Sequence, residues 1–515
     1  MRERLQAIFG HHPDLIEERQ TVYTTLLDVF AQTYGRQERV ALVRAPARLN
    51  LKGVHVDHRG GYVNYLTIDR EIAMAVSPRE DDTVVLHDLE SDRFGPRAFR
   101  IGDDLPAGAR GRWLSYIEQV RPVPGDWANY VKAAVLRLQD HYADRPLRGM
   151  NLLVAGNIPL AAGLSSSSAL VVAACEGCLW VNGLTLSNEQ KALLCGEGEW
   201  YIGTRGGAGD HAAMIFGRRD HLIRLRFFPL TVEPVAFPSG YRVVVCNSLR
   251  QAHKADGAKS TFNERVATYE IGMLLLRQAF PDLAGRLTHL RDINAEQLGL
   301  DEADVYRMVA ALPERVTRAD LLQRLPAHRE TLERLFNTHR EPLDGYRVRA
   351  VCLFGLAECE RSRMYADVLT RGEMETVGRL MELSHDGDRV VTFDGNGRPR
   401  PWGHPVTDAY LRSLVADAQS RDPVRTQRAR LWQQAGGYGC SCEELDQLVD
   451  IAKTVPGVVG AGLTGAGLGG CVLALVQDGF TDALIEAVTA RYYAPRGLSP
   501  SAMVCTSVEG AGRVF

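Results

Sequence analysis

The segment IPLAAGLSSSSAL, residues 158–170, holds four consecutive serines between two apolar patterns. Before it, MNLLVAGN (150–157) predicts a strand that ends at the proline; after it, SSSSALVVAACEGCLWV (165–181) predicts a helix that begins at the serines. A helix N-terminus has unpaired N–H groups and partial positive charge, and small residues before it let a phosphate approach the backbone. The segment fits a phosphate loop or an ordinary serine-capped helix, and it lacks the lysine of G-x-x-x-x-G-K-[ST].

A second glycine-rich segment, GLTGAGLGGCVLALV (462–476), contains the pattern G-x-G-x-x-G. A dinucleotide-binding fold needs a helix directly after these glycines, early in a βαβ unit. Here a strand-like run follows, close to the end of the sequence, so we reject that interpretation. The segment predicts two strands around a glycine turn that packs against another loop or against a phosphate.

A third segment, APARLNLKGVHVDHRGGYVN (45–64), crowds polar side chains between small residues: Arg48, Asn50, His55, Asp57 and His58. An arginine, a carboxylate and a histidine in a non-helical, glycine-bounded segment are typical of a substrate loop. The alternative is a polar surface turn.

The bulk composition limits the classes of function. The 515 residues are 45% hydrophobic, which is enough for a large core split over two domains. A net charge of −3 gives no electrostatic footprint for nucleic acid. The longest uncharged stretch, Thr454–Gln477, is broken by glycines, so we expect no membrane span. MRERLQAIFGHHPD (1–14) has no apolar core long enough for a signal peptide. Ten scattered cysteines predict free thiols in a reducing cytoplasm.

Further patterns organise the chain. Helices are expected at 21–35 and 127–142, and residues 39–51 predict a strand that runs into an irregular segment. YRVVVCNS (241–248) predicts a buried strand, and we place the domain boundary just before it, giving domains 1–235 and 236–515. Residues 262–383 are mostly helical in pattern, whereas 393–430 predict a loop-rich insertion with DGNGRPRPWGHP as its turn.

Taken together, the three segments resemble the three motifs of the GHMP kinases, and within them the galactokinases. ARLNLKGVHVDH (47–58) resembles G-R-x-N-L-I-G-E-H-x-D-Y, PLAAGLSSSS (159–168) resembles P-x-G-x-G-L-S-S-S, and LTGAGLGGC (463–471) resembles M-T-G-x-G-F-G-G-C. WANYVKAAV (127–135), EWYIGTRGGAGDH (199–211) and YGCSCEELDQLVDIAKTVPGV (438–458) resemble the family's W-A-N-Y-V-K-G, E-x-x-x-G-x-x-x-G-x-M-D-Q and Y-x-V-S-C-x-E-L-D segments. The likeness spans about residues 43–476 in the expected order.

The resemblance implies an α+β, two-lobed fold with the active site in the cleft between the lobes. The N-terminal lobe would be a mixed sheet with helices, and the C-terminal lobe helices plus an antiparallel sheet. The reaction would be ATP + sugar → sugar 1-phosphate + ADP. The expected partner is a small-molecule sugar, with no nucleic acid or membrane, in a monomer or weak homo-oligomer.

By resemblance, the loop that cradles the ATP phosphates comprises Gly163, Leu164, Ser165, Ser166, Ser167 and Ser168. Ser167 and Glu199 match the family's Mg²⁺ ligands. Ser166, Ser168 and Glu197 remain alternatives for these two positions. A metal ion can replace the missing lysine because it carries the positive charge.

Asp210 matches the family's aspartate that accepts the proton of the anomeric hydroxyl, and Arg48 matches the arginine that keeps it ionised. Whether Asp210 is a full base or mainly an orienting charge stays open. His55, Asp57, Asp210 and the backbone at Gly207 match sugar contacts. Trp127 lies near the nucleotide in the family, but a core tryptophan is an equal alternative.

The sugar motif also departs from the family. Val54 stands where galactokinases have the glutamate that holds the outer carbon of the sugar, and His58 replaces a tyrosine. Lys52 replaces an apolar residue, although it could equally point to solvent. Phe262 takes the place of a sugar-facing tyrosine, with Lys254 and Lys259 near it in sequence. The expected substrate is galactose or a galactose-like sugar, and these changes suggest one altered at the outer carbon, such as galacturonate or arabinose.

Two rival functions remain. One is a sugar- and ATP-binding regulator without catalysis; the retained Arg48, Glu199 and Asp210 favour an active enzyme. The other is a GHMP kinase for a non-sugar alcohol, such as mevalonate or homoserine. The segments WANYVK, SCEELD and GAGDH favour the sugar branch. The roles of the insertions around 280–345 and 390–430 are left open.

Overall fold

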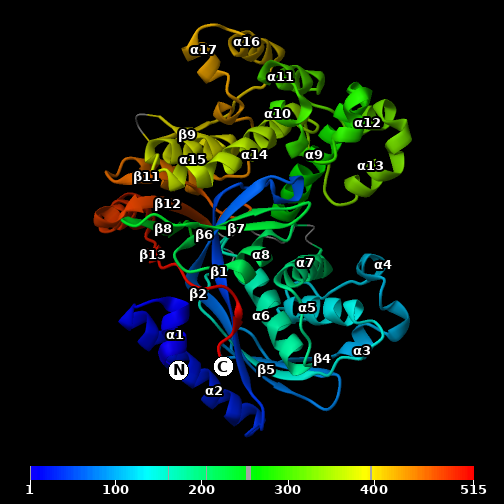
Figure 1. Ribbon diagram of the computed structural model, residues 1–515, viewed down its shortest axis with the longest axis vertical. Helices are drawn as coiled ribbons and strands as arrows, with labels where there is room; N and C mark the ends of the chain where they lie inside the picture. The colour runs from blue at the N-terminus through cyan, green and yellow to red at the C-terminus, as the bar shows by residue number, and fades with distance from the viewer. Residues whose placement is uncertain (1, 161, 204–205, 251–256, 395–396) are drawn as a thin grey trace.

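The expected strand and helix around the four serines are both present, as β5 (Met150–Gly156) and α6 (Ser166–Val181). The computed structural model describes residues 2–160, 162–203, 206–250, 257–394 and 397–515 (Figure 1). Its fold is α+β with two lobes, as predicted. One lobe is built on a mixed sheet, and the other combines an antiparallel sheet with many helices.

Within the described residues the sheet of the first lobe has eight strands, in the order β14-β1-β2-β5-β3-β4, with β6 on β2 and β7 on β6. It is mixed because β3 and β5 run parallel while the other pairs are antiparallel. The remaining strands are β1 (Ala41–Lys52), β2 (Tyr62–Pro78), β3 (Thr83–Asp88), β4 (Arg97–Arg100), β6 (His221–Arg226), β7 (Thr231–Ala236) and β14 (Gly512–Arg513).

Helices cover both faces of this sheet because its strands alternate apolar side chains between the faces. Val43 and Met74 belong to one core cluster with α5 (Ala128–His141), α6 and α8 (Gly209–Phe216). Their neighbours Leu42 and Ala73 face the opposite way, against α1 (Arg2–Phe9) and α2 (Pro13–Tyr34). The other helices of this lobe are α3 (Ile101–Asp104), α4 (Trp113–Gln119) and α7 (Asn188–Glu199).

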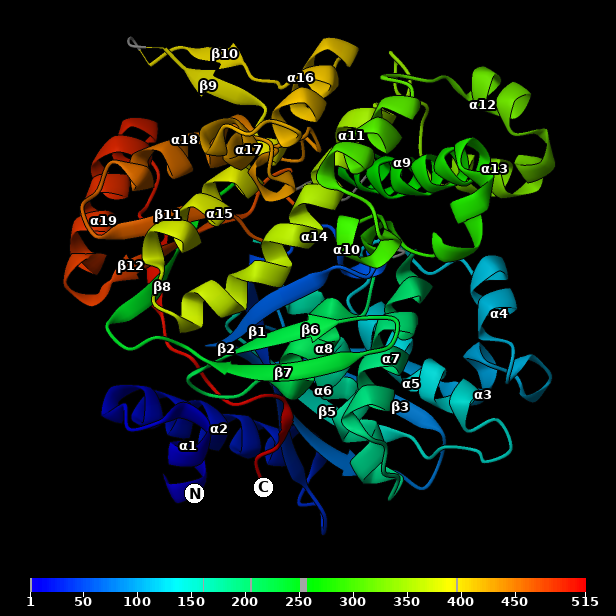
Figure 2. The same cartoon turned by 45° about the horizontal axis from the view of Figure 1, so that its top comes forward.

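The second lobe has a four-stranded antiparallel sheet in the order β11-β12-β8-β13, counted within the described ranges. The strands are β8 (Tyr241–Asn247), β11 (Val458–Leu463), β12 (Cys471–Gln477) and β13 (Ala502–Cys505). The glycine turn joins β11 to β12, as predicted. Helices α15 (Met374–Asp388), α18 (Glu443–Lys453) and α19 (Thr481–Val488) pack against it, and the long helices α14 (Val348–Thr370) and α9 (Ala258–Ala279) lie beyond α15, with α14 packed on both α15 and α9 (Figure 2).

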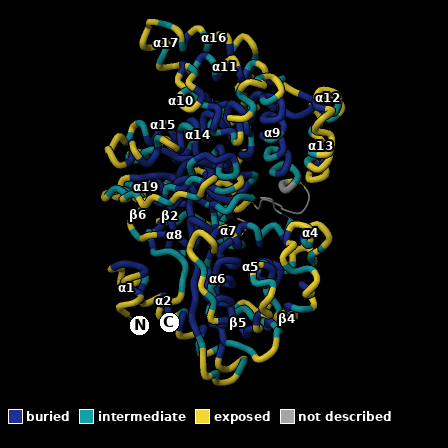
Figure 3. Tube along the Cα trace, turned by 45° about the vertical axis from the view of Figure 1, so that its right-hand side comes forward, coloured by how far each residue is buried: buried dark blue, intermediate teal, exposed yellow. Residues whose placement is uncertain are grey.

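The two insertions form helical outgrowths at the top of the second lobe, where much of the chain is exposed (Figure 3). The loop-rich prediction for 393–430 is wrong in part. A hairpin of β9 (Val391–Phe393) and β10 (Pro399–Pro401) is followed by α16 (Asp408–Ala418) and α17 (Pro423–Arg428), both capped by side chains before their first residue. Residues 395 and 396 of the predicted turn lie outside the described residues. The other insertion holds α10 (Ala295–Leu298), α11 (Glu302–Ala311), α12 (Arg318–Arg324) and α13 (Arg329–Phe336).

The end of the chain returns to the first lobe, where β14 pairs with β1. Ala511 and Gly510 donate backbone hydrogen bonds to Met214 and Gly217 at the end of α8. β7 ends at Ala236 and β8 begins at Tyr241; the boundary between 235 and 236 stays a prediction. No helix in the described ranges combines the length and apolar content needed to cross a membrane.

Candidate active site

An arginine and a carboxylate form a bidentate pair where β1 meets α8. Arg48 Nε lies 2.7 Å from Asp210 Oδ1, and Arg48 Nη2 lies 2.8 Å from Asp210 Oδ2. β1 continues through Arg48 to Lys52, with register shifts on either side of Ala47–Asn50, and the expected irregular segment follows it. Asp210 is the second residue of α8, where the helix dipole also stabilises negative charge.

Asp210 stays ionised in spite of its partial burial. Burial by itself would raise its pKa, but the charge and hydrogen bonds of Arg48, with the Ser165 hydroxyl, lower the pKa of Asp210 to about 2. Ser165 Oγ donates to Asp210 Oδ2 over 2.5 Å, and Tyr65 Oη lies 3.4 Å from Asp210 Oδ1. The carboxylate therefore accepts from four donors on three different side chains.

The serine loop packs backbone to backbone against the late glycine turn. A Cβ at Gly465 would lie 2.7 Å from the carbonyl oxygen of Gly163, and one at Gly163 would lie 2.7 Å from that of Thr464. Both glycines also have positive φ, 80° and 78°. Gly163 O accepts a hydrogen bond from Arg48 Nη1 over 2.7 Å. The glycine turn, the phosphate-loop candidate and the Arg48–Asp210 pair are thus one assembly.

The side chains of the predicted phosphate loop differ in their surroundings, and therefore in what each can offer a phosphate. Leu164 is buried in the core, so it can offer a phosphate its backbone alone. Ser165 has positive φ, 59°, and its hydroxyl is engaged by Asp210. Ser166 and Ser167 are half-buried at the start of α6.

The predicted metal ligand Glu199 is contacted by Ser168 rather than by Ser167. Ser168 Oγ donates to Glu199 Oε2 over 2.9 Å, because the third residue of α6 faces α7. We therefore propose Ser168, in place of Ser167, as the serine ligand of the metal. Glu197 points elsewhere, since its Oε2 lies 2.7 Å from Arg137 Nη2. His211 Nε2 lies 3.0 Å from Glu199 Oε2.

The Ser168 hydroxyl and the Glu199 carboxylate fit a hard cation that takes its remaining ligands from another molecule. In the described part of the chain no cluster of three His, Cys, Asp or Glu side chains forms a self-contained metal site. A hydroxyl and a carboxylate beside the phosphate loop are ligands that Mg²⁺ accepts when nucleotide oxygens supply the rest.

The sugar motif places Asp57 against the segment that leads to Asp210. A Cβ at Gly207 would lie 2.3 Å from Asp57 Oδ2, so a side chain there would displace the Asp57 carboxylate. Asp57 begins a single 3₁₀ turn, Asp57–Arg59, and its Oδ1 lies 2.8 Å from His58 Nδ1. Burial would raise the pKa of Asp57, but hydrogen bonds from His58 hold it below its usual value. Asp57, Gly207 and Asp210 are brought together.

His55 is directed toward the second lobe. Its ring stacks on Tyr438 with centroids 4.2 Å apart, and its Nε2 lies 3.3 Å from Asp388 Oδ2. The side chain is 2% exposed. Its predicted contact with sugar hydroxyls stays a prediction.

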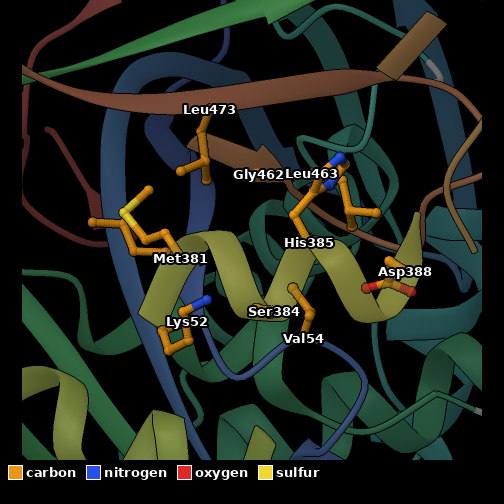
Figure 4. Close-up of a pocket in the computed structure, with 10 residues that line it drawn as sticks. Lys52, Val54, Met381, Ser384, His385, Asp388, Gly462, Leu463 and Leu473 are labelled. Carbon is orange, nitrogen blue, oxygen red and sulfur yellow. The ribbon is translucent and has the colours of Figure 1, made fainter. Parts of the chain in front are cut away.

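The two departures in the sugar motif are buried. Lys52 does not point to solvent: its Nζ lies 4.0 Å from Glu358 Oε1 on α14. Burial lowers the pKa of Lys52 to about 8, although the Glu358 charge opposes this shift. Lys52 and Val54 face α15 across a cavity of about 10 Å³, room for one water (Figure 4). The cavity wall on α15 includes Ser384, His385 and Asp388.

The remaining sequence-predicted residues contribute little to the description of the site. Phe262 is half-buried on α9, and Lys254 lies outside the described residues. Trp127 is buried, with Nε1 donating to the carbonyl of Gly95, as the core alternative requires. Tyr65 escaped the sequence reasoning because it sits in an apolar strand pattern. His211 could have been found, since it stands where the family's M-D-Q segment has glutamine.

Three family models match the chain. Residues 129–218 match the GHMP kinases N terminal domain, residues 28–78 the galactokinase galactose-binding signature, and residues 414–494 the GHMP kinases C terminal domain. The chain is 28% identical over 492 residues to a galactokinase of Roseiflexus sp. (strain RS-1), covering 95% of this chain and 97% of that one.

Two further comparisons cover a similarly large share of the chain. A galactokinase of Dictyostelium discoideum is 25% identical over 484 residues, covering 93% of this chain and 89% of that protein. The crystal structure of Lactococcus lactis galactokinase complexed with galactose superposes with a TM-score of 0.65 at 23% identity, over 95% of this chain and 99% of that one. At this identity the superposition shows a shared fold.

Proposed function

We propose that the protein is an ATP-dependent sugar 1-kinase, because segments of the chain match the N- and C-terminal domains of the GHMP kinases and a galactokinase galactose-binding signature. It would transfer the γ-phosphate of ATP to the anomeric hydroxyl of a galactose-like sugar. The observation that carries this proposal is the Arg48–Asp210 pair, which lies beside the serine loop and within reach of the sugar motif. Phosphoryl transfer depends mainly on positioning and charge, which these groups supply.

In this mechanism Asp210 orients the attacking hydroxyl more than it removes a proton. Its carboxylate already accepts bonds from Arg48, Ser165 and Tyr65, and its pKa of about 2 makes it a weak base. The sugar hydroxyl would replace one of the two hydroxyl donors. Its proton would pass to Asp210 only as the oxygen binds phosphorus and becomes acidic. Arg48 would stabilise the charge that develops on the phosphoryl group.

The serine loop would hold the ATP phosphates through backbone N–H groups at the start of α6. Ser168 and Glu199 would hold Mg²⁺, and the ion would supply the positive charge that a P-loop lysine supplies elsewhere. Leu164 anchors the loop in the core, so that the N–H groups keep their direction.

The burial of Lys52 bears on the choice of sugar. A uronic acid would need a free cation near its carboxylate, whereas the Lys52 ammonium is paired with Glu358 and faces α15. Val54 belongs to an apolar cluster of the second lobe. We therefore propose a neutral sugar, galactose or a pentose such as arabinose, in preference to galacturonate.

A panel of galactose, arabinose, galacturonate and glucose, assayed for ADP release with ATP and Mg²⁺, tests this proposal. Turnover is expected with a neutral galactose-like sugar, with kcat/KM for galacturonate far lower. Preference for galacturonate would overturn the choice of sugar. Absence of turnover with every sugar, together with stabilisation by sugar and ATP, would favour the non-catalytic regulator.

The ten cysteines are all free thiols, and nine of them are buried. This agrees with our proposal that the protein works in a reducing compartment such as the cytoplasm. Its assembly as a monomer or weak homo-oligomer stays a prediction.

A further inference from the structure

Three helices of the first lobe each place one polar side chain at the same point beside the serine loop. These are Ser168 from α6, Glu199 from α7 and His211 from α8. Ser168 Oγ lies 2.9 Å, and His211 Nε2 lies 3.0 Å, from the same atom, Glu199 Oε2. Ser168 and His211 are almost fully buried, at 2% and 1% exposure.

The contact of His211 with Glu199 is close without being a hydrogen bond. Neither ring nitrogen of His211 has a hydrogen-bond partner among the described residues, although both are buried. The ring N–H direction therefore misses Glu199 Oε2 despite the short separation. Burying an imidazole with both nitrogens unpaired is unfavourable, which points to a missing partner.

The separations match those between adjacent ligands of one metal ion. An octahedral ion with ligands at about 2.1 Å keeps neighbouring donor atoms about 3.0 Å apart. A nitrogen in that relation aims at the ion rather than at the neighbouring oxygen, which fits the direction of His211 Nε2. Ser168 Oγ and His211 Nε2 both keep this distance from the Glu199 oxygen.

We propose that His211 Nε2 is a third protein ligand, beside Ser168 and Glu199, of the divalent cation that accompanies ATP. An imidazole donor shifts preference away from Mg²⁺ and toward first-row transition ions such as Mn²⁺. The proposal rests on the nucleotide site of the proposed function, since the nucleotide phosphates complete the shell. It concerns the choice of metal and not the choice of sugar.

The alternative is that His211 only orients Glu199 by donating a hydrogen bond after a small rotation of its ring. A glutamine at position 211 could still donate such a bond but would remove the nitrogen donor. Glutamine also matches the family's M-D-Q segment. H211Q therefore separates the two roles.

The test is pulsed EPR of Mn²⁺ bound to the full-length protein with AMP-PCP, whose bridging atom is carbon, without sugar. The proposal predicts electron spin echo modulation from a histidine nitrogen, which changes when the protein is labelled with ¹⁵N-histidine. A signal that is insensitive to the label would overturn it. This measurement needs no variant, so it does not depend on how a substitution folds.

Competition of Mg²⁺ against Mn²⁺ gives the second readout. We expect H211Q to lose the nitrogen signal and to weaken Mn²⁺ binding by about tenfold or more, with a smaller effect on Mg²⁺. H385Q is the matched control, because His385 is equally buried, with Nε2 3.3 Å from Asp446 Oδ1 in the other lobe. If H211Q bound Mn²⁺ and Mg²⁺ with the same ratio of affinities as the wild type, the proposal would be contradicted. If the protein phosphorylates a sugar but shows no histidine nitrogen signal, His211 is not a metal ligand and the proposed kinase function stands. If the nitrogen signal is present but no sugar is phosphorylated, His211 is a metal ligand and the proposed kinase function is wrong.

Discussion

Glu358 on α14 accepts a hydrogen bond from the backbone N–H of Gly53, at a distance of 2.9 Å between Oε1 and N. A carboxylate of the second lobe thus holds the first residue of the turn that leads to Asp57. Glu358 is fully buried, and its other oxygen accepts from Arg361 Nε over 2.7 Å. The sugar motif is therefore fixed from the opposite lobe, which makes the relative position of the lobes part of the site.

Replacing Glu358 should weaken both the fold and sugar binding. E358Q removes the charge that faces Lys52 and Arg361, so it should lower the free energy of unfolding by about 3 kcal/mol. It should also raise KM for the sugar more than KM for ATP. E360Q on the same helix is the control: Glu360 pairs with the exposed Arg363, so a loss of about 0.5 kcal/mol or less is expected. Urea unfolding and steady-state kinetics check both, and equal effects of the two variants would refute the role of Glu358.

Lys52 should make stability depend on pH in the alkaline range. Its pKa is about 8 in the folded protein, against 10.5 when exposed. Between these values the unfolded chain binds the proton and the folded chain does not, so stability rises with pH across that window. The gain is about 3 kcal/mol for a complete titration.

The measurement compares wild type with K52M by urea unfolding from pH 7 to pH 10. The difference in free energy should move in favour of wild type as the pH rises through 8, because methionine has no proton to lose. K453M is the control, since Lys453 is 34% exposed beside Glu382. A constant difference between wild type and K52M would mean that Lys52 is not desolvated.

The bidentate geometry of Arg48 should matter beyond its charge. R48K keeps a cation but cannot make both contacts with Asp210, so kcat/KM should fall by roughly 100-fold or more. The fold should persist, because the lysine stem can still occupy β1. Steady-state kinetics with circular dichroism check this, and near-normal turnover would show that one contact is enough.

The glycine turn should tolerate no side chain at Gly465. G465A places a Cβ 2.7 Å from the carbonyl oxygen of Gly163 at a φ of 80°, so the two loops must separate. We expect a loss of about 2 kcal/mol in stability and a raised KM for ATP. G479A is the control, because nothing lies within 4 Å of its Cβ position and its φ is not positive. An unchanged KM for ATP in G465A would separate this turn from the nucleotide site.

The sequence predicted the local elements around the site because an apolar period acts over short distances, whereas the pairing of Arg48 with Asp210, 162 residues apart, followed only from the family resemblance. It preferred Ser167 and kept Ser168 as an alternative, since only the packing of α6 on α7 decides which serine faces Glu199. The burial of Lys52 could not be foreseen, because its neighbour Gly53 is held by a carboxylate 305 residues away in the chain. The helices α16 and α17 were missed because glycine and proline in the preceding hairpin dominated the pattern.

In the proposed mechanism Asp210 serves phosphoryl transfer to a sugar. The most direct measurement is ADP release with galactose, ATP and Mg²⁺ for wild type and for D210N, which preserves the shape of the side chain. We expect turnover by wild type and a loss in kcat of about 10²–10⁴-fold in D210N, with a fold that persists by circular dichroism but an unfolding temperature that falls by several degrees, because the buried Arg48 loses its charged partner. Turnover by D210N at the wild-type rate, or no sugar-dependent ADP release by wild type with any sugar of the panel, would contradict it.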